Sequence, residues 1–500
     1  MRTDVLVVGS GIAGASAAIR AVEKGADVTV VTEATRPDDT NTGWAQGGVA
    51  RRAPEERAEE FVADVLDAGA GEGDEDAVEL LVKEGTEVVE EFLVDELGVD
   101  FDANEDDCTD GADGFDLARE GGHSYDRVLH KGDATGLAVQ RALLRRLADT
   151  DARVLEAHSA LELVKDEGEG RVEGALVVDR TEGEAFVVEA GATVLATGGI
   201  GDVYGRTTNP PGATGDGVAM ATLAGARVDD MEFVQFHPTA HAERGFLLSE
   251  ALRGEGALLV ADGERFMEAY DDRMELAPRD IVATAVHEVN RDSQAYLDLN
   301  PVFESTDFEE EFPTAYENLN DEELETGLVP VAPAEHFLCG GVVVDENGTA
   351  SVEGLYAVGE TACTGVHGAN RLASTSLLEG LTWGLRAGEH TAENAGEPSG
   401  VERETDAFNG DMPEGFVDAK FEKLQSLMWE NVGPLRDGGS LRETRTELQR
   451  LRGEVKSYAR GRLDPELYSL RNAVVVGLLI TEAALRNKES VGCHRRVEVD

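Results

Sequence analysis

Three clusters of polar residues between positions 235 and 280 hold side chains that could do chemistry. His237 stands directly before a proline, Ser249 precedes a charged segment with two glycines, and Arg279 follows Pro278. Proline restricts the backbone of its own residue and of the residue before it, which suits side chains that must be aimed. A lone histidine is more often a core residue, and a lone arginine is more often half of a surface ion pair. A catalytic or binding role for His237 and Arg279 is therefore inferred only because these clusters occur together with the motifs below.

The N-terminal segment predicts a nucleotide-binding β-α-β unit. The expected elements are a strand over Asp4–Val8, a helix over Ala15–Lys24 and a second strand over Asp27–Val31, which Glu33 follows. The glycines of the G-x-G-x-x-G turn let the backbone approach a pyrophosphate at the helix N-terminus, and Glu33 is placed to bond a ribose hydroxyl. The predicted dinucleotide contacts are Gly9, Ser10, Gly11, Ile12, Ala13, Gly14 and Glu33.

In order and spacing, the three clusters resemble the substrate-capping domain of the succinate dehydrogenase, fumarate reductase and L-aspartate oxidase flavoproteins, and the L-aspartate oxidase branch most. The resemblance covers nearly the whole chain. It implies an α/β fold: an FAD-binding Rossmann-type domain with an inserted α+β capping domain and a C-terminal helical domain. The expected boundaries are 1–230 with 338–396 for the FAD-binding domain, 231–337 for the capping domain and 397–500 for the helical domain.

The same resemblance implies that the glycine-rich segment from Thr40 to Gly48 runs beneath the flavin ring. Considered without the resemblance, the segment is predicted only to be a loop. The respiratory members of the family carry a histidine at the position of Asn41 that bonds covalently to the flavin, which asparagine cannot do. We therefore expect noncovalently bound FAD. The implied FAD contacts are Asn41, Thr42, Gly43, Trp44, Ala45, Gln46, Gly47, Gly48, Thr197, Gly198, Asp216, Glu360, Ser376 and Leu377.

Another set of residues would bind a dicarboxylate substrate. Guanidinium groups bind carboxylates with a fixed geometry that an ammonium group lacks. The residues expected to hold the two carboxylates are Arg371, His237 and His336. Ser249 would donate a hydrogen bond through its hydroxyl group, and Gln235 would orient its neighbours.

Glu120 and Arg279 are expected to decide which substrate reacts and how. At the place of Glu120 the succinate and fumarate enzymes tend to carry an apolar residue, so this carboxylate suits a substrate that brings a positive charge. Arg279 matches the proton donor and acceptor of the family. Because a guanidinium has a pKa above ~12, a role as electrostatic clamp is the safer expectation.

The implied reaction is oxidation of L-aspartate to iminoaspartate by hydride transfer from Cα to flavin N5, with O2 or fumarate as acceptor. In the family this product leads to quinolinate and NAD, so quinolinate synthase is a candidate partner. One alternative is a fumarate reductase or succinate dehydrogenase flavoprotein subunit, against which Asn41 and Glu120 argue. Another is a noncatalytic flavin-binding or scaffold protein, which would be expected to lose aimed residues such as His237 and Arg279.

The composition narrows the class of protein further. With 101 acidic and 44 basic residues the net charge is −57, which opposes binding to nucleic acid and to anionic lipid. The acidic residues are spread along the chain, which indicates a solvated surface of the kind seen in salt-adapted cytosols. Hydrophobic residues make up 41% of the chain, enough to fill two or three domains. The longest uninterrupted apolar run, Ala473–Ile480, is far shorter than the ~20 residues that span a bilayer, so a soluble cytoplasmic protein is expected.

Four widely spaced cysteines, Cys108, Cys339, Cys363 and Cys493, argue against a metal site and a disulfide framework. Other segments predict secondary structure: two helices over 61–97, a β-meander over 152–196, and helices over 421–451 and 467–486. The final motif, Glu489–His494, lacks the arginine that the family usually carries there. Whether the C-terminus contributes to the active site is therefore left open.

Overall fold

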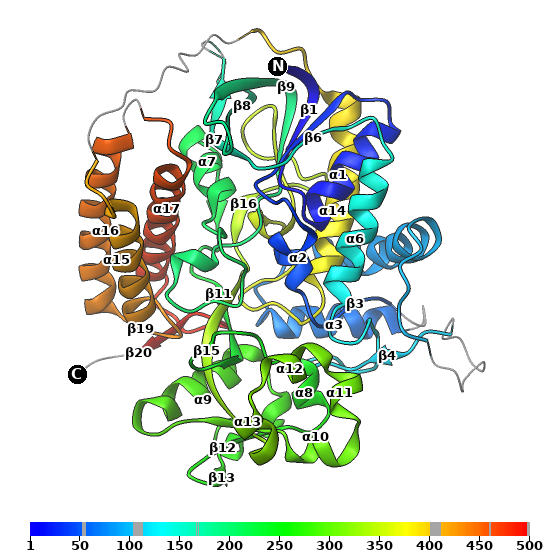
Figure 1. Ribbon diagram of the computed structural model, residues 1–500, viewed down its shortest axis with the longest axis vertical. Coiled ribbons are helices and arrows are strands. Elements are labelled where there is room, and N and C mark those ends of the chain that lie inside the picture. The colour runs from blue at the N-terminus through cyan, green and yellow to red at the C-terminus, as the bar shows by residue number, and fades with distance from the viewer. Residues whose placement is uncertain are drawn as a thin grey trace.

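The computed structural model describes residues 1–52, 57–103, 114–166, 168, 170–400, 412–459 and 462–497; Cys108 lies outside this part of the chain. Figure 1 shows a mixed α/β region at the top, which we call the upper domain, a smaller region below it, which we call the cap, and a helical bundle at one side. The arrangement confirms the predicted α/β fold with an inserted cap and a C-terminal helical region.

The upper domain is built on a seven-stranded sheet. In pairing order the strands are β6 (Arg153–Leu155), β2 (Val28–Val31), β1 (Arg2–Val8), β9 (Ala185–Leu195), β8 (Val172–Asp179) and β7 (His158–Lys165), with β17 (Leu355–Ala357) also paired to β9. The strands β6, β2, β1, β9 and β17 run parallel, as a nucleotide-binding sheet requires. The predicted meander consists of β7, β8 and β9, whereas β6 belongs to the parallel edge.

Two helices begin at the ligand-binding edge of this sheet. The helix α1 (Ile12–Glu23) follows β1, and α14 (Ser376–Asn394) packs along it (Figure 1). The packing requires glycine, because a Cβ at Gly384 would lie 2.6 Å from the carbonyl oxygen of Ala13. The close contact fixes the start of α14 relative to the nucleotide-binding turn.

Shorter elements complete the upper domain. The predicted helical pair over 61–97 is confirmed, as α3 followed by a helical stretch that includes two π-helical segments, Leu81–Gly85 and Val89–Glu96. The helices are α2 (Asn41–Trp44), α3 (Ala58–Ala68), α4 (Glu75–Leu80), α5 (Thr86–Val88), α6 (Thr135–Ala148) and α7 (Asp216–Ala224). The small strands are β3 (Val49–Ala50), β4 (Leu117–Ala118), β5 (Val128–Leu129), β10 (Val228–Asp229), β16 (Gly341–Val343) and β18 (Ala362–Cys363).

The cap is a five-stranded antiparallel sheet with helices around it. Its strands are β11 (Val234–His241), β15 (Leu328–Leu338), β14 (Tyr296–Asp298), β12 (Leu258–Ala261) and β13 (Glu264–Arg265); its helices are α8 (Glu250–Gly254), α9 (Arg279–Asp292), α10 (Asn300–Ser305), α11 (Phe308–Glu311), α12 (Pro313–Asn318) and α13 (Asp321–Thr326). The chain enters through β11 and leaves through β15, which pair with each other. The predicted boundaries of the capping domain at 231 and 337 remain a proposal. The positions of β11 and β15 support it.

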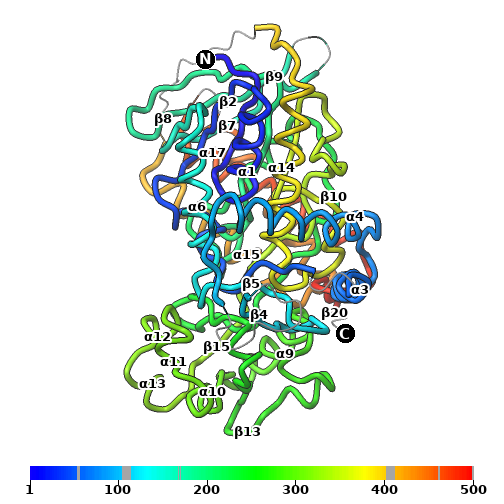
Figure 2. The backbone as a smooth tube through the Cα atoms, turned by 90° about the vertical axis from the view of Figure 1, so that its right-hand side faces the viewer, coloured from blue at the N-terminus to red at the C-terminus, as the bar shows by residue number. Residues whose placement is uncertain are grey.

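The helical bundle differs from the prediction in one respect. The stretch over 421–451 is two helices, α15 (Phe416–Asn431) and α16 (Gly438–Ala459), because Gly433-Pro434 and β19 (Leu435–Asp437) separate them. The third helix, α17 (Pro465–Arg486), is long and apolar enough to cross a membrane, but 78% of its apolar window is buried in the protein. The helix α17 is therefore a core helix of the protein. The last strand, β20 (Arg495–Val497), pairs with β19 and lies at the level where the cap begins in Figures 1 and 2.

Candidate active site

A continuous cavity of about 880 Å³ lies among the upper domain, the cap and the helical bundle. One end is lined by the Gly9 turn and Glu33, and the other by His237, Arg279 and Arg371. A volume of this size falls within the range of cofactor pockets, ≈ 300–1,000 Å³. The two ends correspond to the predicted nucleotide and substrate sites.

Most of the predicted site residues line this cavity, and three do not. Gly14 packs against the turn, since a Cβ there would lie 2.1 Å from the carbonyl oxygen of Gly9. Gly43 packs against Pro37 in the same way, and Gln235 lies behind the cavity wall. The predicted residues that do line it are Gly9, Ser10, Gly11, Ile12, Ala13, Glu33, Asn41, Thr42, Trp44, Ala45, Gln46, Gly47, Gly48, Glu120, Thr197, Gly198, Asp216, His237, Ser249, Arg279, His336, Glu360, Arg371, Ser376 and Leu377.

The start of α1 is shaped to receive a phosphate group. Gly9 has a φ of +108°, and a Cβ there would lie 2.1 Å from the carbonyl oxygen of Ala196, so only glycine fits. The N-cap residue Gly11 has no side chain to satisfy the first amides of the helix, and Thr42 Oγ1 accepts from only one of them, Ile12 N, at 2.9 Å. The remaining amides can bind an anionic cofactor. The residues present therefore fit a dinucleotide.

Glu33 has partners that the sequence did not reveal. Its carboxylate accepts hydrogen bonds from Ser159 Oγ at 2.5 Å and from Arg180 Nη1 at 2.9 Å. Both residues come from the meander, far away in the sequence. Because a carboxylate can accept about four hydrogen bonds, Glu33 keeps capacity for a ribose hydroxyl.

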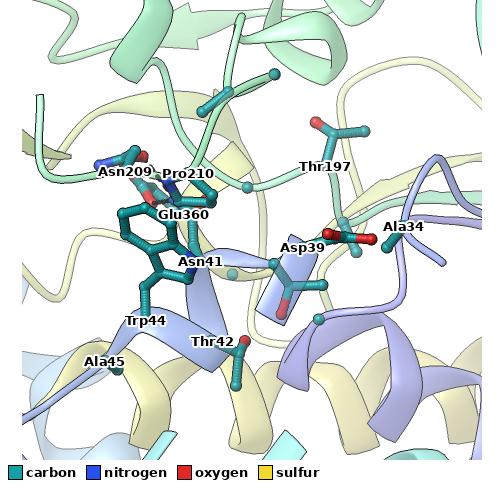
Figure 3. A pocket seen from close by; sticks show the side chains of 18 of the residues that line it. Ala34, Asp39, Asn41, Thr42, Trp44, Ala45, Thr197, Asn209, Pro210 and Glu360 are labelled. Carbon is teal, nitrogen blue, oxygen red and sulfur yellow. Dashed lines mark hydrogen bonds between the residues drawn. The ribbon is translucent and has the colours of Figure 1, made fainter. Parts of the chain in front are cut away.

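Asn41 belongs to a partly buried polar group beside the flavin-binding segment. Its side-chain nitrogen donates to Asn209 Oδ1 at 2.7 Å and to Glu360 Oε2 at 3.2 Å. Figure 3 shows Asn41, Asn209, Glu360 and the Trp44 indole gathered on one side of the cavity. Burial raises the pKa of Glu360 to about 7. The amide of Asn41 is thus occupied with protein contacts.

Asp216 connects the cavity to the helical bundle. The side chain of Asn472, on α17, donates a hydrogen bond to its carboxylate at 2.7 Å. Burial, together with the negative charge of Glu33, raises the pKa of Asp216 to about 6. The bundle therefore supports a predicted cofactor contact directly.

Arg371 supplies a buried guanidinium group at the substrate end. It donates to Ser376 Oγ at 2.6 Å and to His336 Nε2 at 3.0 Å, and it lies over the Phe337 ring at 4.5 Å. Burial and the nearby Arg279 lower the pKa of Arg371 to about 10, so it remains a cation. Within the described structure it forms no ion pair with a carboxylate.

The two histidines differ in the hydrogen-bonding role they can take. Since Thr239 N donates to Nδ1 of His237 at 3.3 Å, the proton of the neutral ring lies on Nε2, which has no partner in the described structure. Arg371 donates to Nε2 of His336, so that ring carries its proton on Nδ1 and donates to Thr208 Oγ1 at 2.7 Å. Burial lowers the pKa of both rings well below the usual value. His237 is thus free to donate to a ligand, whereas both ring nitrogens of His336, which was expected to hold a carboxylate, have protein partners.

Arg279 is held by Glu250, which was not among the predicted site residues, and by Gln235, which was. Its Nε donates to Glu250 at 2.5 Å, and Glu250 also pairs with Arg253 at 3.0 Å. Burial alone would raise the pKa of Glu250, but the two guanidinium groups outweigh burial and lower it. Gln235 accepts from Arg279 at 3.1 Å and donates to the backbone oxygen of Arg371 at 2.8 Å, so it contacts both arginines. The spacing of Glu250 and Arg253, three residues apart on a helix, was a usable signal for the pair.

Glu120 is a buried carboxylate at the same end of the cavity. It accepts a hydrogen bond from Ser374 Oγ at 2.5 Å and has no ion-pair partner among the described residues. Burial and the charge of Glu250 raise its pKa. Ser249 also lines the cavity, and its hydroxyl makes no side-chain cap for α8. Among the described residues, the substrate end therefore offers one carboxylate and one guanidinium without ion-pair partners, together with free hydrogen-bond donors.

Two family models and several known proteins match most of this chain. The FAD binding domain family matches residues 4–377, and the fumarate reductase flavoprotein C-terminal family matches residues 421–500. An L-aspartate oxidase of Halobacterium salinarum is 53% identical, covering 99% of this chain and 96% of the relative. An L-aspartate oxidase of Ralstonia nicotianae is 41% identical, covering 99% and 95%. A solved variant of E. coli quinol fumarate reductase is 27% identical with a TM-score of 0.87, covering 100% of this chain and 91% of the other.

Proposed function

The chain belongs to the L-aspartate oxidase family of FAD-binding proteins, and we propose that it oxidises L-aspartate to iminoaspartate with O2 or fumarate as electron acceptor. The observation that carries the proposal is the pair of opposite buried charges at the substrate end. Arg371 lacks a carboxylate partner and Glu120 lacks a cation partner in the described structure. Aspartate carries a carboxylate for the first and an ammonium group for the second.

The residues of the chain have distinct roles in this proposal. Arg371 and the Nε2 proton of His237 bind carboxylate oxygens, and Ser249 adds a hydroxyl donor. His336 positions Arg371, and Gln235 aligns Arg371 with Arg279. Bound FAD supplies the hydride acceptor.

Arg279 acts as an electrostatic clamp in this proposal. Its contact with Glu250 fixes the direction of the guanidinium group at the cavity. A fixed cation at this position favours the substrate orientation in which the reacting carbon faces the cofactor. Arg253 completes the series by neutralising the second oxygen of Glu250.

Substrate binding would stabilise the ionised form of Glu120. Burial raises its pKa in the empty site, and the substrate ammonium group would favour the ionised form. The bound ammonium group must lose a proton as the imine forms, and we assign Glu120 as the acceptor of that proton.

The decisive experiment is the anaerobic addition of L-aspartate to the purified flavoprotein in high salt. Reduction should bleach the flavin absorbance at roughly 450 nm. Succinate serves as the comparison substrate, because it lacks the ammonium group. Bleaching by succinate alone would favour the fumarate reductase alternative, and bleaching by neither compound would refute oxidase activity.

We also propose that the FAD is bound noncovalently, because position 41 is an asparagine whose amide contacts Asn209 and Glu360. Acid precipitation should release all of the flavin into the supernatant. Flavin that remains in the pellet would contradict this. The wider role, supply of iminoaspartate for quinolinate and NAD synthesis in the cytoplasm with quinolinate synthase as a partner, is proposed on family membership.

A further inference from the structure

The position of the cap depends on side-chain contacts, because only two strands connect it to the upper domain. The chain crosses through the paired strands β11 and β15. Such a ribbon permits rotation, so noncovalent contacts must hold the first turn of α9 over the cavity. Arg279 lies at that first turn and Asp280 follows it.

Asp280 is a junction of three parts of the protein. Its side chain is 8% exposed, and its Oδ2 pairs with Arg495 Nη2 at 3.1 Å. Its Oδ1 accepts from Asn370 Nδ2 at 3.2 Å. Arg495 belongs to β20, Asn370 to the upper domain and Asp280 to the cap, so one buried carboxylate joins all three.

The C-terminal segment is fixed firmly enough to act on Asp280. Cys493 donates from its backbone nitrogen to the carbonyl oxygen of Ala369 at 2.9 Å and from its thiol to Asn370 at 3.2 Å. A Cβ at Gly492 would lie 2.4 Å from the same carbonyl oxygen, so the two segments are in close contact. The pairing of β20 with β19 then fixes the backbone from which Arg495 extends.

From this junction the contacts continue to the substrate arginines. Asn370 accepts from Gln235 Nε2 at 2.8 Å, and Gln235 accepts from Arg279 at 3.1 Å. The start of α9 is not held by close packing alone, because a cavity of about 20 Å³ lies between Pro278 and Arg279 of the cap and the 370–373 segment. Polar contacts such as that of Asp280 therefore add to packing in holding this part of the helix.

We propose that Arg495 is a positioning residue, which through Asp280 holds the first turn of α9 and aims Arg279 at the substrate. The inference rests on the proposed function for its effect on turnover. It assigns to the C-terminus a contribution that the missing arginine of the Glu489–His494 motif left open. Exposed ion pairs usually contribute little, but here removal of Arg495 leaves a buried carboxylate without its cation.

The test compares Arg495→Ala and Arg495→Lys with Arg486→Ala, which removes the same charge from an exposed position on α17. Turnover is expressed per bound flavin, so that loss of folded protein or of cofactor is not counted. Arg495→Ala should lower kcat for L-aspartate by roughly ten-fold, within the 10²-fold that a misplacement of 1 Å can cost. The change in KM should be smaller, Arg495→Lys should recover part of the loss, and Arg486→Ala should match the wild type.

Hydrogen exchange provides a readout that does not depend on the reaction. Amide exchange in α9 should be faster in Arg495→Ala than in Arg486→Ala, with α17 unchanged in both. Unchanged exchange in α9, or faster exchange with unaltered kcat per flavin, would overturn the proposal. If the wild-type protein does not oxidise L-aspartate, the proposed function fails, and exchange alone decides whether Arg495 holds α9.

Discussion

Glu120 and Arg371 are the two buried charges at the substrate end that no oppositely charged residue of the described structure neutralises. Each is held by a serine, Ser374 for the carboxylate and Ser376 for the guanidinium. Unpaired buried charges are costly, so their retention at one end of a cavity points to a ligand that carries both complementary charges. A zwitterionic dicarboxylate meets that requirement, and succinate does not.

Glu120→Gln should therefore separate the oxidation of L-aspartate from the reduction of fumarate. At ~4 Å and an effective dielectric of ~20, the carboxylate and ammonium groups attract by roughly 4 kcal/mol before desolvation. Loss of half of that would reduce aspartate turnover by one to two orders of magnitude, whereas fumarate reduction should be spared or improved. Steady-state rates with both substrates, measured beside flavin content and a melting curve, test this. Equal loss of both activities together with stability would instead make Glu120 a structural residue.

Asp216 predicts a pH dependence of stability in the flavin-free protein. Its pKa rises from 3.8 to about 6, so the folded chain binds this proton more tightly than the unfolded chain. Stability is therefore lost as pH rises from about 4 to about 6, by up to about 3 kcal/mol at 1.36 kcal/mol per unit. Asp216→Asn keeps an acceptor for Asn472, and its melting temperature should exceed that of the wild type by a margin that grows from about pH 4 to about pH 6 and then levels off. A constant difference across that range would refute the link to Asp216.

At the scale of elements, the sequence predicts what depends on local pattern. Residue type and spacing predict the turn after β1, the helix α1, the helical character of the bundle and the clusters around His237 and Arg279. Contacts between distant segments are a different case. Glu33 meets Arg180 across 147 residues, which no local pattern in a single sequence encodes. The split between α15 and α16 was local, and Gly433-Pro434 was the signal for it.

Asp133 is another such long-range contact, and it joins the upper domain to the cap. Its carboxylate accepts hydrogen bonds from Thr314 N and Oγ1, both at 2.8 Å, and from Ala315 N at 3.2 Å. Asp133→Ala should lower stability by roughly 1–2 kcal/mol, as the loss of a helix cap does. It should also lower kcat/KM for L-aspartate, because the cap then closes less firmly.

The matched control for Asp133 is Asp307→Ala. Asp307 caps α11 by accepting from Glu310 N, but both residues lie within the cap. The control should lose a similar amount of stability and keep its kcat/KM. Parallel losses of activity in the two variants would show that Asp133 has no special role between the domains.

At the scale of the whole molecule, the net charge of −57 makes the fold sensitive to salt. Surface carboxylates repel one another over the Debye length, which is ~3 Å at 1 M and ~10 Å at 0.1 M. Lowering KCl from 1 M to 0.1 M should therefore reduce the melting temperature.

The cause can be separated from general solute effects with sucrose, which favours compact states by exclusion from the protein surface and screens no charge. Sucrose added at low salt should restore less of the melting temperature than KCl does. Raising the KCl concentration should also increase the melting temperature most at neutral pH, where the carboxylates are ionised, and least near the pI of about 4.4. A melting temperature indifferent to KCl at neutral pH would refute self-repulsion as a determinant of this fold. A response to sucrose as large as that to KCl would assign the effect to exclusion of the solute from the surface.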